Sequence, residues 1–506
     1  MLGQKIGVQF FSQLALGGLG LASTTLIARF GGAEVMGTIG YLLGLLGLLS
    51  MFSDLGYAQA HIQSVAQGKD LGKSNGTLVA IYSFLIGAFL IVSLIYLFLA
   101  SQQNSIIFLK SDLRFLFVIL LFSQVFLFFG QTLLLTFQAK QEMAKLNFVL
   151  ITSKIARFIA TIVIIFFVVN SITVGLTFLI EAVVVFILSV WFFKKLPLKM
   201  PNVAFLKSYT KYALPLAISL PITYFNGNID KILLNHFWNI KEVGYYFAIF
   251  GIISMAQTFS GAAMTLFFPE LVKMTKTGFK NAEVSIALMV KYLLLIIVPI
   301  VVLLIFFSKV IVTYFLGDEF LPSAPVLSIF SLSIFILLIA RFYGYILYAI
   351  EKHAILPIIS FGTTIFFLLF FLILVPKSFL NLPTLGLGAQ GAAWASVLSL
   401  LFNLIVVLFF VWKYTKIKPH YGVFVNATVG VLDYFIILYI VKIFDLNIFN
   451  PFSAFLLTIG VFVNFIILLF LLKYLKREDL DYLIKLLNIK KLVKDSLVEF
   501  KGNTEQ

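Results

Sequence analysis

The chain has 506 residues, of which 61% are hydrophobic and only 11% are charged, and its mean hydropathy is +1.08. Water-soluble proteins carry about 25% charged residues, so this composition, with its 58 phenylalanines, excludes a soluble protein. The net charge of +16 does not indicate a nucleic-acid partner, because the cations lie mainly in short loops between apolar runs, as membrane topology requires. We predict an all-α protein that crosses a membrane many times.

Apolar runs long enough to cross a bilayer, at about 20 residues each, follow one another along the chain. The first run begins directly after Lys5 and is longer than the apolar part of a signal peptide, so we expect it to remain as a helix. Alternate loops carry most of the lysines, which predicts a multi-pass protein of the cell (inner) membrane with both termini in the cytoplasm. We count about fourteen transmembrane helices, near residues 7–28, 35–60, 77–100, 112–137, 148–169, 172–193, 206–229, 242–267, 284–307, 324–350, 354–375, 385–412, 421–443 and 452–473.

The stretch 26–60 reads as the end of one helix, a tight turn and a second helix. Small residues in the second helix step by three and four positions, so they fall along one stripe of its surface, and the stripe ends in a carboxylate. Such a stripe lets neighbouring helices approach closely and slide. Its members are Gly37, Gly40, Gly44, Gly47, Met51 and Asp54.

The stretch 233–267 matches the first one when the sequence is shifted by 207 residues. In this register Phe30 aligns with Phe237, Gly37 with Gly244, and Gly44 with Gly251. The stripe then becomes Gly244, Phe247, Gly251, Ser254, Thr258 and Gly261. Two apolar windows can match by composition alone, but an internal repeat would give the protein two similar halves, as in many transporters.

Ionisable residues inside the apolar runs carry the functional information, because each costs several kcal/mol in hydrocarbon unless it faces a cavity or a partner. We expect the three deep cations, Lys154, Arg157 and Arg341, to face a shared, hydrated interior, while Arg29 and Lys231 lie at the ends of their helices. The acids are either partners of these cations or sites for a coupling ion, and both interpretations stay open: Asp54, Glu181 and Asp230.

Uncharged polar residues also form stripes on three of the predicted helices. They are Gln9, Gln13, Gly17, Gly20 and Thr24 in the first, Gln124, Gln131 and Gln138 in the fourth, and Ser219, Thr223, Asn226 and Asp230 in the seventh. Such residues either join helices by hydrogen bonds or line a cavity. With arginines among them, we predict a cavity to which Gln13, Gln124, Gln131, Thr223 and Asn226 contribute polar contacts. Pro215 and Pro221 predict a bent or interrupted seventh helix.

Enzyme signatures are weak in this chain, and we predict no enzymatic activity, no metal site and no cofactor. The segment 68–74, GKDLGKS, has three residues between its glycines where a phosphate-binding P-loop has four. The four histidines lie in different loops: His61, His236, His353 and His420. Cysteine is absent, which excludes disulfides and thiolate sites. A membrane glycosyltransferase is the enzyme alternative, but no long outer loop is present.

The segment after the last apolar run, 476–506, places Leu480, Leu483, Ile484 and Leu487 on one side of a helix and charged residues on the other. An amphipathic helix on the inner leaflet fits this pattern, and a solvated tail helix is the alternative.

Short motifs in both halves resemble the polysaccharide-transport flippases, of the O-antigen-flippase type, in the multidrug/oligosaccharidyl-lipid/polysaccharide (MOP) exporter superfamily. They are Ala-Arg-Phe-Gly at 28–31, Gly37, Ser-Asp-Leu-Gly at 53–56, Tyr-Ala-Leu-Pro-Leu at 212–216, Asn-Ile-Asp-Lys at 228–231 and Glu-Val-Gly-Tyr-Tyr at 242–246. His61 is a departure, since relatives often have arginine there. The resemblance implies two pseudo-symmetric six-helix lobes, 1–200 and 201–418, two extra helices in 419–475 and a cytoplasmic tail.

The resemblance also implies a flippase that moves an oligosaccharide linked to a polyprenyl lipid through phosphate or pyrophosphate to the outer leaflet by alternating access. For such a substrate, the candidates for binding phosphate are Arg29, Lys154, Arg157, Lys231 and Arg341. The partners expected are this lipid-linked oligosaccharide, membrane lipids and the glycan polymerase or glycosyltransferase machinery, and we expect a monomer. Na⁺ and H⁺ are the candidate coupling ions. The alternative function is a cation-coupled multidrug exporter of the MATE type, whose cavity would favour carboxylates because many of its substrates are cationic.

Overall fold

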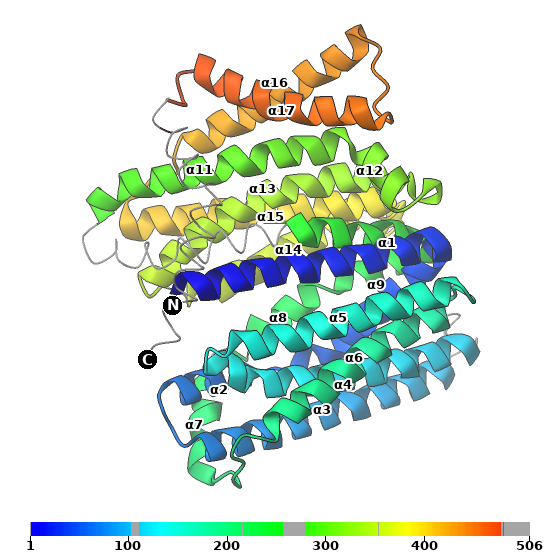
Figure 1. The fold of residues 1–506 in the computed structure, drawn as a ribbon, viewed down its shortest axis with the longest axis vertical. Helices are drawn as coiled ribbons and strands as arrows, with labels where there is room; N and C mark the ends of the chain where they lie inside the picture. The colour runs from blue at the N-terminus through cyan, green and yellow to red at the C-terminus, as the bar shows by residue number, and fades with distance from the viewer. Residues whose placement is uncertain are drawn as a thin grey trace, which may run out of the picture. The chain divides into compact units, whose positions relative to one another are not determined.

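The computed structural model describes residues 2–102, 111–214, 216–217, 219–256, 279–352, 354–476 and 479, and almost all of them are in helices (Figure 1). Within these residues, eleven helices are long and apolar enough to cross a membrane. The predicted all-α membrane fold is confirmed, while the count of fourteen spans stays a prediction. One short hairpin is the exception to helix and turn: β1 (Ser378–Phe379) pairs antiparallel with β2 (Leu382–Pro383).

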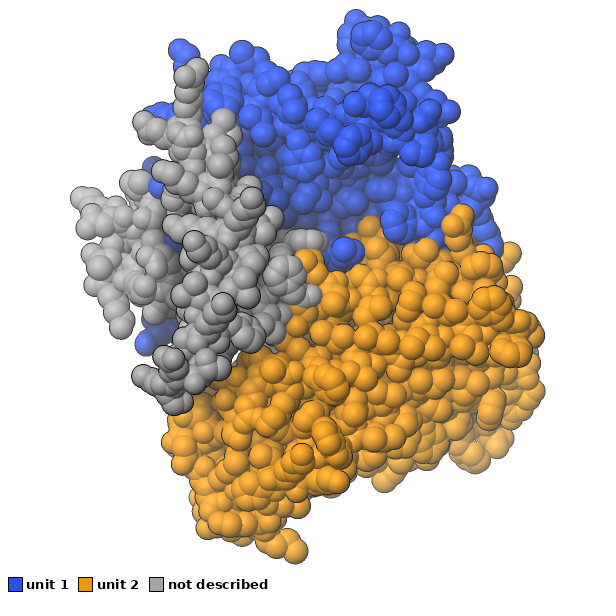
Figure 2. Space-filling model, viewed as in Figure 1, with its two compact units in different colours: residues 1–10, 253–359, 393–506 blue, residues 11–252, 360–392 orange. Residues whose placement is uncertain are grey.

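Two compact units make up the chain, and Figure 2 colours them separately. Unit 2 comprises residues 11–252 and 360–392. Its helices in chain order are α1 (Leu2–Leu49, from residue 11), η1 (Ser50–Phe52), α2 (Tyr57–Ala66), α3 (Leu71–Gln102), α4 (Ser111–Ala139), α5 (Met143–Ile165), α6 (Ser171–Phe193), α7 (Val203–Ala213), α8 (Ser219–Asn226), α9 (Ile229–Phe237), a helix whose described part covers 240–256, and most of α14 (Ile355–Leu374). Within this unit α4 packs against α3, α5 and α6.

Unit 1 comprises residues 1–10, 253–359 and 393–506. Its helices are α11 (Phe279–Phe306), α12 (Ser308–Phe315), η2 (Asp318–Phe320), α13 (Ser323–Ala349), most of α15 (Gly388–Thr415), α16 (Gly422–Ile443) and α17 (Pro451–Leu471). Here α11 packs against α13, α16 and α17. The lobe boundaries near residues 200 and 418 remain predictions from the sequence.

The ends of several helices follow from local sequence. Asn170 caps α6 by accepting a hydrogen bond from the Thr173 backbone N–H, and the Thr173 hydroxyl accepts one from the Asn170 N–H in return. Asn450 caps α17 in a similar way and is followed by Pro451, whose fixed φ suits the first helical position. Between their ends, apolar helices in lipid are maintained by their own backbone hydrogen bonds.

The predicted tight turn after the first helix is present at Gly32, whose φ of 76° interrupts α1. Only glycine adopts this left-handed conformation without strain, so the turn is fixed by one residue. The second predicted helix, however, ends earlier than expected. It stops at Leu49, and η1 and a break precede α2 at Tyr57.

Asp54 therefore does not lie in a helix, which corrects the prediction that it closes a helical stripe. Its Oδ1 accepts hydrogen bonds from the backbone N–H of Gly56 and Ala58, and from the hydroxyl of Tyr82 at 2.9 Å. Gly56, the residue just before α2, has a φ of 93°, which glycine adopts without strain. Asp54 thus begins α2 by occupying backbone donors that have no partner within the helix.

The predicted interruption of the seventh helix is also present. The segment is divided into α7, which ends at Ala213, α8, which covers Ser219–Asn226, and α9, which begins at Ile229. Pro221 lies inside α8, while Pro215 lies outside the described residues. Where a helix is broken into short pieces, backbone groups at each break have no partner within a helix and can bond to side chains instead. The carbonyl group of Gly227 is one of these.

The internal repeat is supported by reciprocal contacts between the two stretches that suggested it. A Cβ on Gly37 would overlap the carbonyl oxygen of Ile240, and a Cβ on Gly244 would overlap the carbonyl oxygen of Ala33. Ala33 and Ile240 are separated by the same 207 residues as Gly37 and Gly244. Each helix therefore meets its own repeat equivalent through the same backbone surface.

The reciprocity continues two turns further along both helices. A Cβ on Gly44 would lie 3.2 Å from the Lys231 side chain, and a Cβ on Gly251 would lie 3.5 Å from the Thr24 side chain. Thr24 and Lys231 are again 207 residues apart. A pseudo-two-fold relation between the repeats explains all these pairs with one register.

Replacing Gly37 by alanine is expected to lower thermal stability, because the new methyl group can be accommodated only if two helix backbones separate. Overpacking of this kind costs about 1–3 kcal/mol. The measurement is thermal unfolding of the purified protein in detergent. The control is Gly87→Ala in α3, where a Cβ would meet nothing within 4 Å, and equal stability of the two variants would contradict the close crossing.

A buried polar cluster joins α2, α3, α4 and α7 inside unit 2. His61, which is fully buried, lies 3.0 Å through Nδ1 from the Tyr209 hydroxyl and 2.9 Å through Nε2 from the Thr136 hydroxyl. The Thr136 hydroxyl donates to Asn75 Oδ1, so it accepts from the His61 Nε2–H. The Tyr209 hydroxyl also donates to the Ser74 carbonyl oxygen at 3.3 Å, so the cluster extends from the His61 ring to the backbone of α3.

Stability is expected to fall in acid because of His61. Burial lowers the pKa of His61 from 6.5 to about 4, so the unfolded chain binds a proton that the folded protein does not. This contribution is complete above pH 6.5 and is lost as the pH falls towards 4, by about 3 kcal/mol in total. Thermal unfolding across this range should show a smaller acid loss in His61→Gln than in the wild type. The exposed His236→Gln control should follow the wild type.

Candidate functional site

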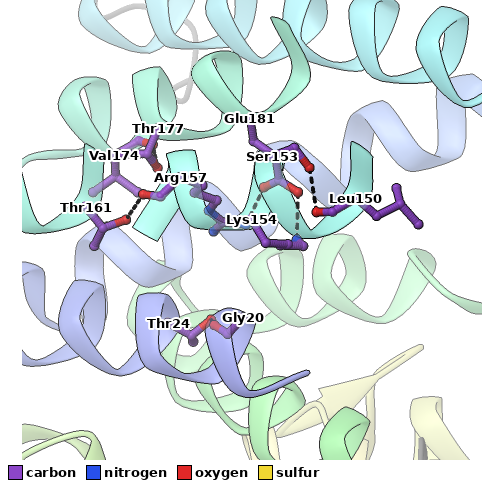
Figure 3. Close-up of polar contacts among 10 residues, drawn as sticks. All are labelled: Gly20, Thr24, Leu150, Ser153, Lys154, Arg157, Thr161, Val174, Thr177 and Glu181. Atoms are coloured by element: carbon purple, nitrogen blue, oxygen red, sulfur yellow. Dashed lines mark hydrogen bonds and ion pairs between the residues drawn. The ribbon is translucent and has the colours of Figure 1, made fainter. Parts of the chain in front are cut away.

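Three ionisable side chains from α5 and α6 form a buried cluster in unit 2, which we call the α5–α6 charge cluster: Lys154, Arg157 and Glu181 (Figure 3). Lys154 and Arg157 are three residues apart and so share a face of α5. Lys154 Nζ lies 2.7 Å from Glu181 Oε1, and Arg157 Nη1 lies 3.2 Å from Glu181 Oε2. Two cations share one carboxylate, which leaves one net positive charge.

Arg157 also borders a cavity of about 130 Å³ inside unit 2. Its guanidinium carbon lies 3.6 Å from the centre of the Phe178 ring, a close cation–π contact, and its Nε has no hydrogen-bond partner. The Thr24 side chain from α1 is the other polar group that lines the cavity. The remaining lining is apolar: Ile27, Met36, Ile39, Val174, Phe178, Phe247, Phe250 and Gly251.

Lys231 and Asp230 form a second buried ion pair, at the start of α9. Lys231 Nζ lies 3.0 Å from Asp230 Oδ1 and donates to the Gly227 carbonyl oxygen at 2.6 Å, at the break before α9. The Tyr246 hydroxyl donates to the other Asp230 oxygen at 2.9 Å. Lys231 Nζ lies 5.2 Å from the centre of the Phe250 ring, which also lines the Arg157 cavity. The pair therefore lies beside that cavity and is locally neutral.

Arg341 lines a separate cavity of about 390 Å³ inside unit 1. This arginine forms no ion pair or side-chain hydrogen bond with the described part of the chain. Polar groups from α13 and α15 line the same space, namely Tyr345, Tyr348 and Asn403, together with Leu337, Ala340, Gly344, Leu356, Ile359 and Val407. An arginine among aromatic and amide side chains offers a charged fork and several hydrogen-bonding groups to a polar ligand.

The structure leaves the other predicted site residues outside these two cavities. Arg29 is exposed near the turn at Gly32. Gln13 and Gln124 are partly buried, and Gln131 is exposed. Thr223 is exposed in α8, while Asn226 Oδ1 is buried without a hydrogen-bond partner. Asp54 binds backbone donors at the start of α2 and is part of no ion pair among the described residues.

Several lining residues escaped the sequence analysis. Phe178 and Phe250 are two of 58 phenylalanines, and no pattern separates them from those that face lipid. A signal did exist for the other cavity, since Arg341, Tyr345 and Tyr348 step by four and three residues along α13 and so share a face. Within the described residues, no group of three histidines, aspartates or glutamates is placed to hold a metal ion.

A bundle of apolar helices with an internal repeat, an interrupted helix and an arginine at each of two cavities defines a multi-pass membrane protein. Residues 2–275, more than half of the chain, match the family described as "Polysaccharide biosynthesis protein". The chain belongs to this family.

Solved structures of transporters share the fold. The lipid II flippase MurJ in an inward closed conformation matches with a TM-score of 0.68 and 18% sequence identity, over 91% of this chain and 97% of that one. An inward-facing multidrug resistance MATE transporter of the MOP superfamily matches with a TM-score of 0.57 and 14% identity, over 80% and 94%. The MATE transporter DinF-BH matches with a TM-score of 0.56 and 16% identity, over 84% and 95%.

A search of curated protein sequences gives no match. The predicted resemblance to polysaccharide-transport proteins is confirmed at the level of the family by the match over residues 2–275, and the predicted transporter fold is confirmed by the shared fold.

Proposed function

We propose that this protein is a flippase that moves a polyprenyl-phosphate- or pyrophosphate-linked oligosaccharide from the cytoplasmic to the outer leaflet of the cell membrane by alternating access. The observation that carries the proposal is an arginine at each of two cavities, Arg157 in unit 2 and Arg341 in unit 1. Arginine binds phosphate oxygens through two parallel N–H bonds, so these side chains suit an anionic headgroup.

The two arginines differ in whether a carboxylate already occupies the guanidinium group that would bind phosphate. Arg341 has no carboxylate partner in the described part of the chain and is available at once. Arg157 is held by Glu181, so a phosphate would have to compete with that carboxylate or join the cluster through Lys154. We therefore assign first contact with phosphate to Arg341, and to the α5–α6 charge cluster a weaker, exchangeable role.

The sugar part of the substrate would need hydroxyl and amide partners together with aromatic faces. Tyr345, Tyr348 and Asn403 supply these around Arg341, and Thr24 supplies a hydroxyl beside Arg157. The polyprenyl chain needs no polar site, because it can stay in the surrounding lipid while the headgroup crosses. The coupling ion, Na⁺ or H⁺, the cytoplasmic location of both termini, the monomeric state and an association with glycan-assembling enzymes are further parts of this proposal.

A cation-coupled multidrug exporter is the competing function, and the shared fold with MATE transporters supports it. An exporter of cationic drugs is expected to line its cavity with carboxylates. The two described cavities instead contain arginine, and the acids beside the Arg157 cavity are paired with cations: Glu181 with Lys154 and Arg157, and Asp230 with Lys231. The charge at the cavities therefore favours an anionic substrate.

The experiment is transport by the purified full-length protein in proteoliposomes. Flipping of a fluorescent polyprenyl-pyrophosphate oligosaccharide is measured beside uptake of a cationic dye under Na⁺ and H⁺ gradients. We expect flipping of the anionic lipid and no dye transport. Dye transport without lipid flipping would overturn the proposal in favour of the exporter.

A further inference from the structure

A carboxyl group lies fully buried in the middle of α16, far from the two arginine cavities in sequence. Asp433 is 0% exposed and is the twelfth residue of a 22-residue helix that is apolar enough to cross the membrane. Its Oδ1 is bonded to the side-chain amide of Asn464 in α17, and its Oδ2 has no hydrogen-bond partner. No cation neutralises it within the described residues, so an ionised carboxylate would be strongly disfavoured here.

Among the side chains that the structure describes, the other ionisable groups on the packed helices do not face Asp433. α17 contains none between residues 451 and 471. On α11, Lys291 Nζ and the Tyr292 hydroxyl both bond to Asp479, near the middle of the helix. Gly430, one turn before Asp433, packs against Val298 and Val302 of α11, so Asp433 lies about three turns beyond Lys291. The other ionisable residues of α16 itself are Tyr434, whose ring packs on Phe306, and Tyr439 and Lys442, which are exposed.

The bond to Asn464 suits a protonated carboxyl group. The separation is 2.6 Å with the amide nitrogen as donor, which is shorter than usual N–H···O bonds and within the range of O–H···O bonds. Turning the amide over would place its carbonyl oxygen there, as the acceptor of a carboxyl O–H. Asn426, seven residues earlier on the same face of α16, is also fully buried, so polar groups continue along this face.

We propose that Asp433 is a reversible proton-binding site in the α16–α17 helix pair, with Asn464 as its hydrogen-bond partner. The ligand is the proton itself, and the site needs no substrate. The inference is independent of the proposed function, because it rests on helices that contribute no residue to either arginine cavity.

The test is infrared spectroscopy of the purified full-length protein, as the difference between the wild type and Asp433→Asn, from about pH 6 to about pH 9. We expect a protonated-carboxyl C=O band at low pH that is replaced by carboxylate bands, falling about tenfold for each pH unit above its midpoint. A carboxylate at every pH would overturn the proposal. So would a protonated band that never titrates, since Asp433 would then be a fixed structural donor, or a band that Na⁺ removes at constant pH.

A second measurement needs no variant and so does not depend on how Asp433→Asn folds. Dicyclohexylcarbodiimide reacts with protonated carboxyl groups in apolar surroundings: the carboxyl oxygen adds to the carbodiimide carbon, the proton moves to nitrogen, and the O-acylisourea rearranges to a stable N-acylurea. Mass spectrometry of peptides should find the adduct on Asp433 and less of it as the pH rises. The exposed Asp445 is the internal control, and equal labelling of both carboxyls would overturn the proposal.

Discussion

Arg341→Ala is expected to slow flipping of the lipid-linked oligosaccharide about tenfold to a hundredfold in proteoliposomes. The reason is the loss of a charge-assisted hydrogen-bonding group, which is worth about 1.5–3 kcal/mol, in a cavity that offers no second cation within the described residues. Arg341→Lys should recover part of the rate, because lysine keeps the charge but not the planar fork. Thermal unfolding should change little, since Arg341 forms no ion pair with the described residues.

The matched control for Arg341→Ala is Arg114→Ala, which removes an exposed arginine near the start of α4. It should flip lipid at the wild-type rate. Arg157→Ala is expected to reduce flipping as well, but it also leaves Glu181 with Lys154 alone, so Arg341 gives the cleaner result. Full activity of both Arg341→Ala and Arg157→Ala would remove arginine from the transport mechanism.

Glu181→Gln is expected to destabilise the protein by about 3–5 kcal/mol, which is the usual consequence of leaving buried charges without a partner. Lys154 and Arg157 share this one carboxylate, and the side chains of Arg157 and Glu181 are only 10% and 11% exposed. The same variant raises the net charge beside the cavity, so binding of a polyprenyl pyrophosphate should become tighter while stability falls. These opposite changes are measured by thermal unfolding in detergent and by lipid binding.

Glu142→Gln provides a closely matched control for Glu181→Gln. Glu142 also pairs with two cations, Lys140 and Lys145, but at the surface between α4 and α5. Hydrogen bonds from Lys140 and Lys145 lower the pKa of Glu142. Exposed pairs contribute about 0–1 kcal/mol, so this variant should unfold near the wild-type temperature. Equal losses in Glu181→Gln and Glu142→Gln would show that burial does not strengthen the α5–α6 charge cluster.

Much of the architecture could be predicted from the sequence, because lipid imposes simple rules. A chain with too few charged residues to cover a water-facing surface must lie in the membrane. In lipid, a helix pairs its own backbone N–H and C=O groups, so the apolar runs form helices. The 207-residue register was also readable from the sequence, and the structure adds that Gly37 and Gly244, which it aligns, meet at a close helix crossing. Small residues are informative in this way because a close crossing excludes any Cβ.

The break after Leu49 was missed for a physical reason. The run from Gly37 to Asp54 keeps helical spacing in the sequence, but Asp54 bonds to the backbone of Gly56 and Ala58 and begins a new helix. Hydrogen bonds from a side chain to the backbone compete with the hydrogen bonds that would continue a helix, and the spacing of residues in the sequence does not show which will form.

The sequence by itself determined that this protein is a helical membrane protein with an internal repeat, and that unusual cations lie within its apolar helices. Only the tertiary structure decided how those charges are used. Lys154 and Arg157 are bound to Glu181, Lys231 is bound to Asp230, and Arg341 remains available beside its cavity. The physical reason is that pairing depends on distances of a few ångströms between different helices, and spacing along one helix fixes which face a residue occupies but not what that face meets.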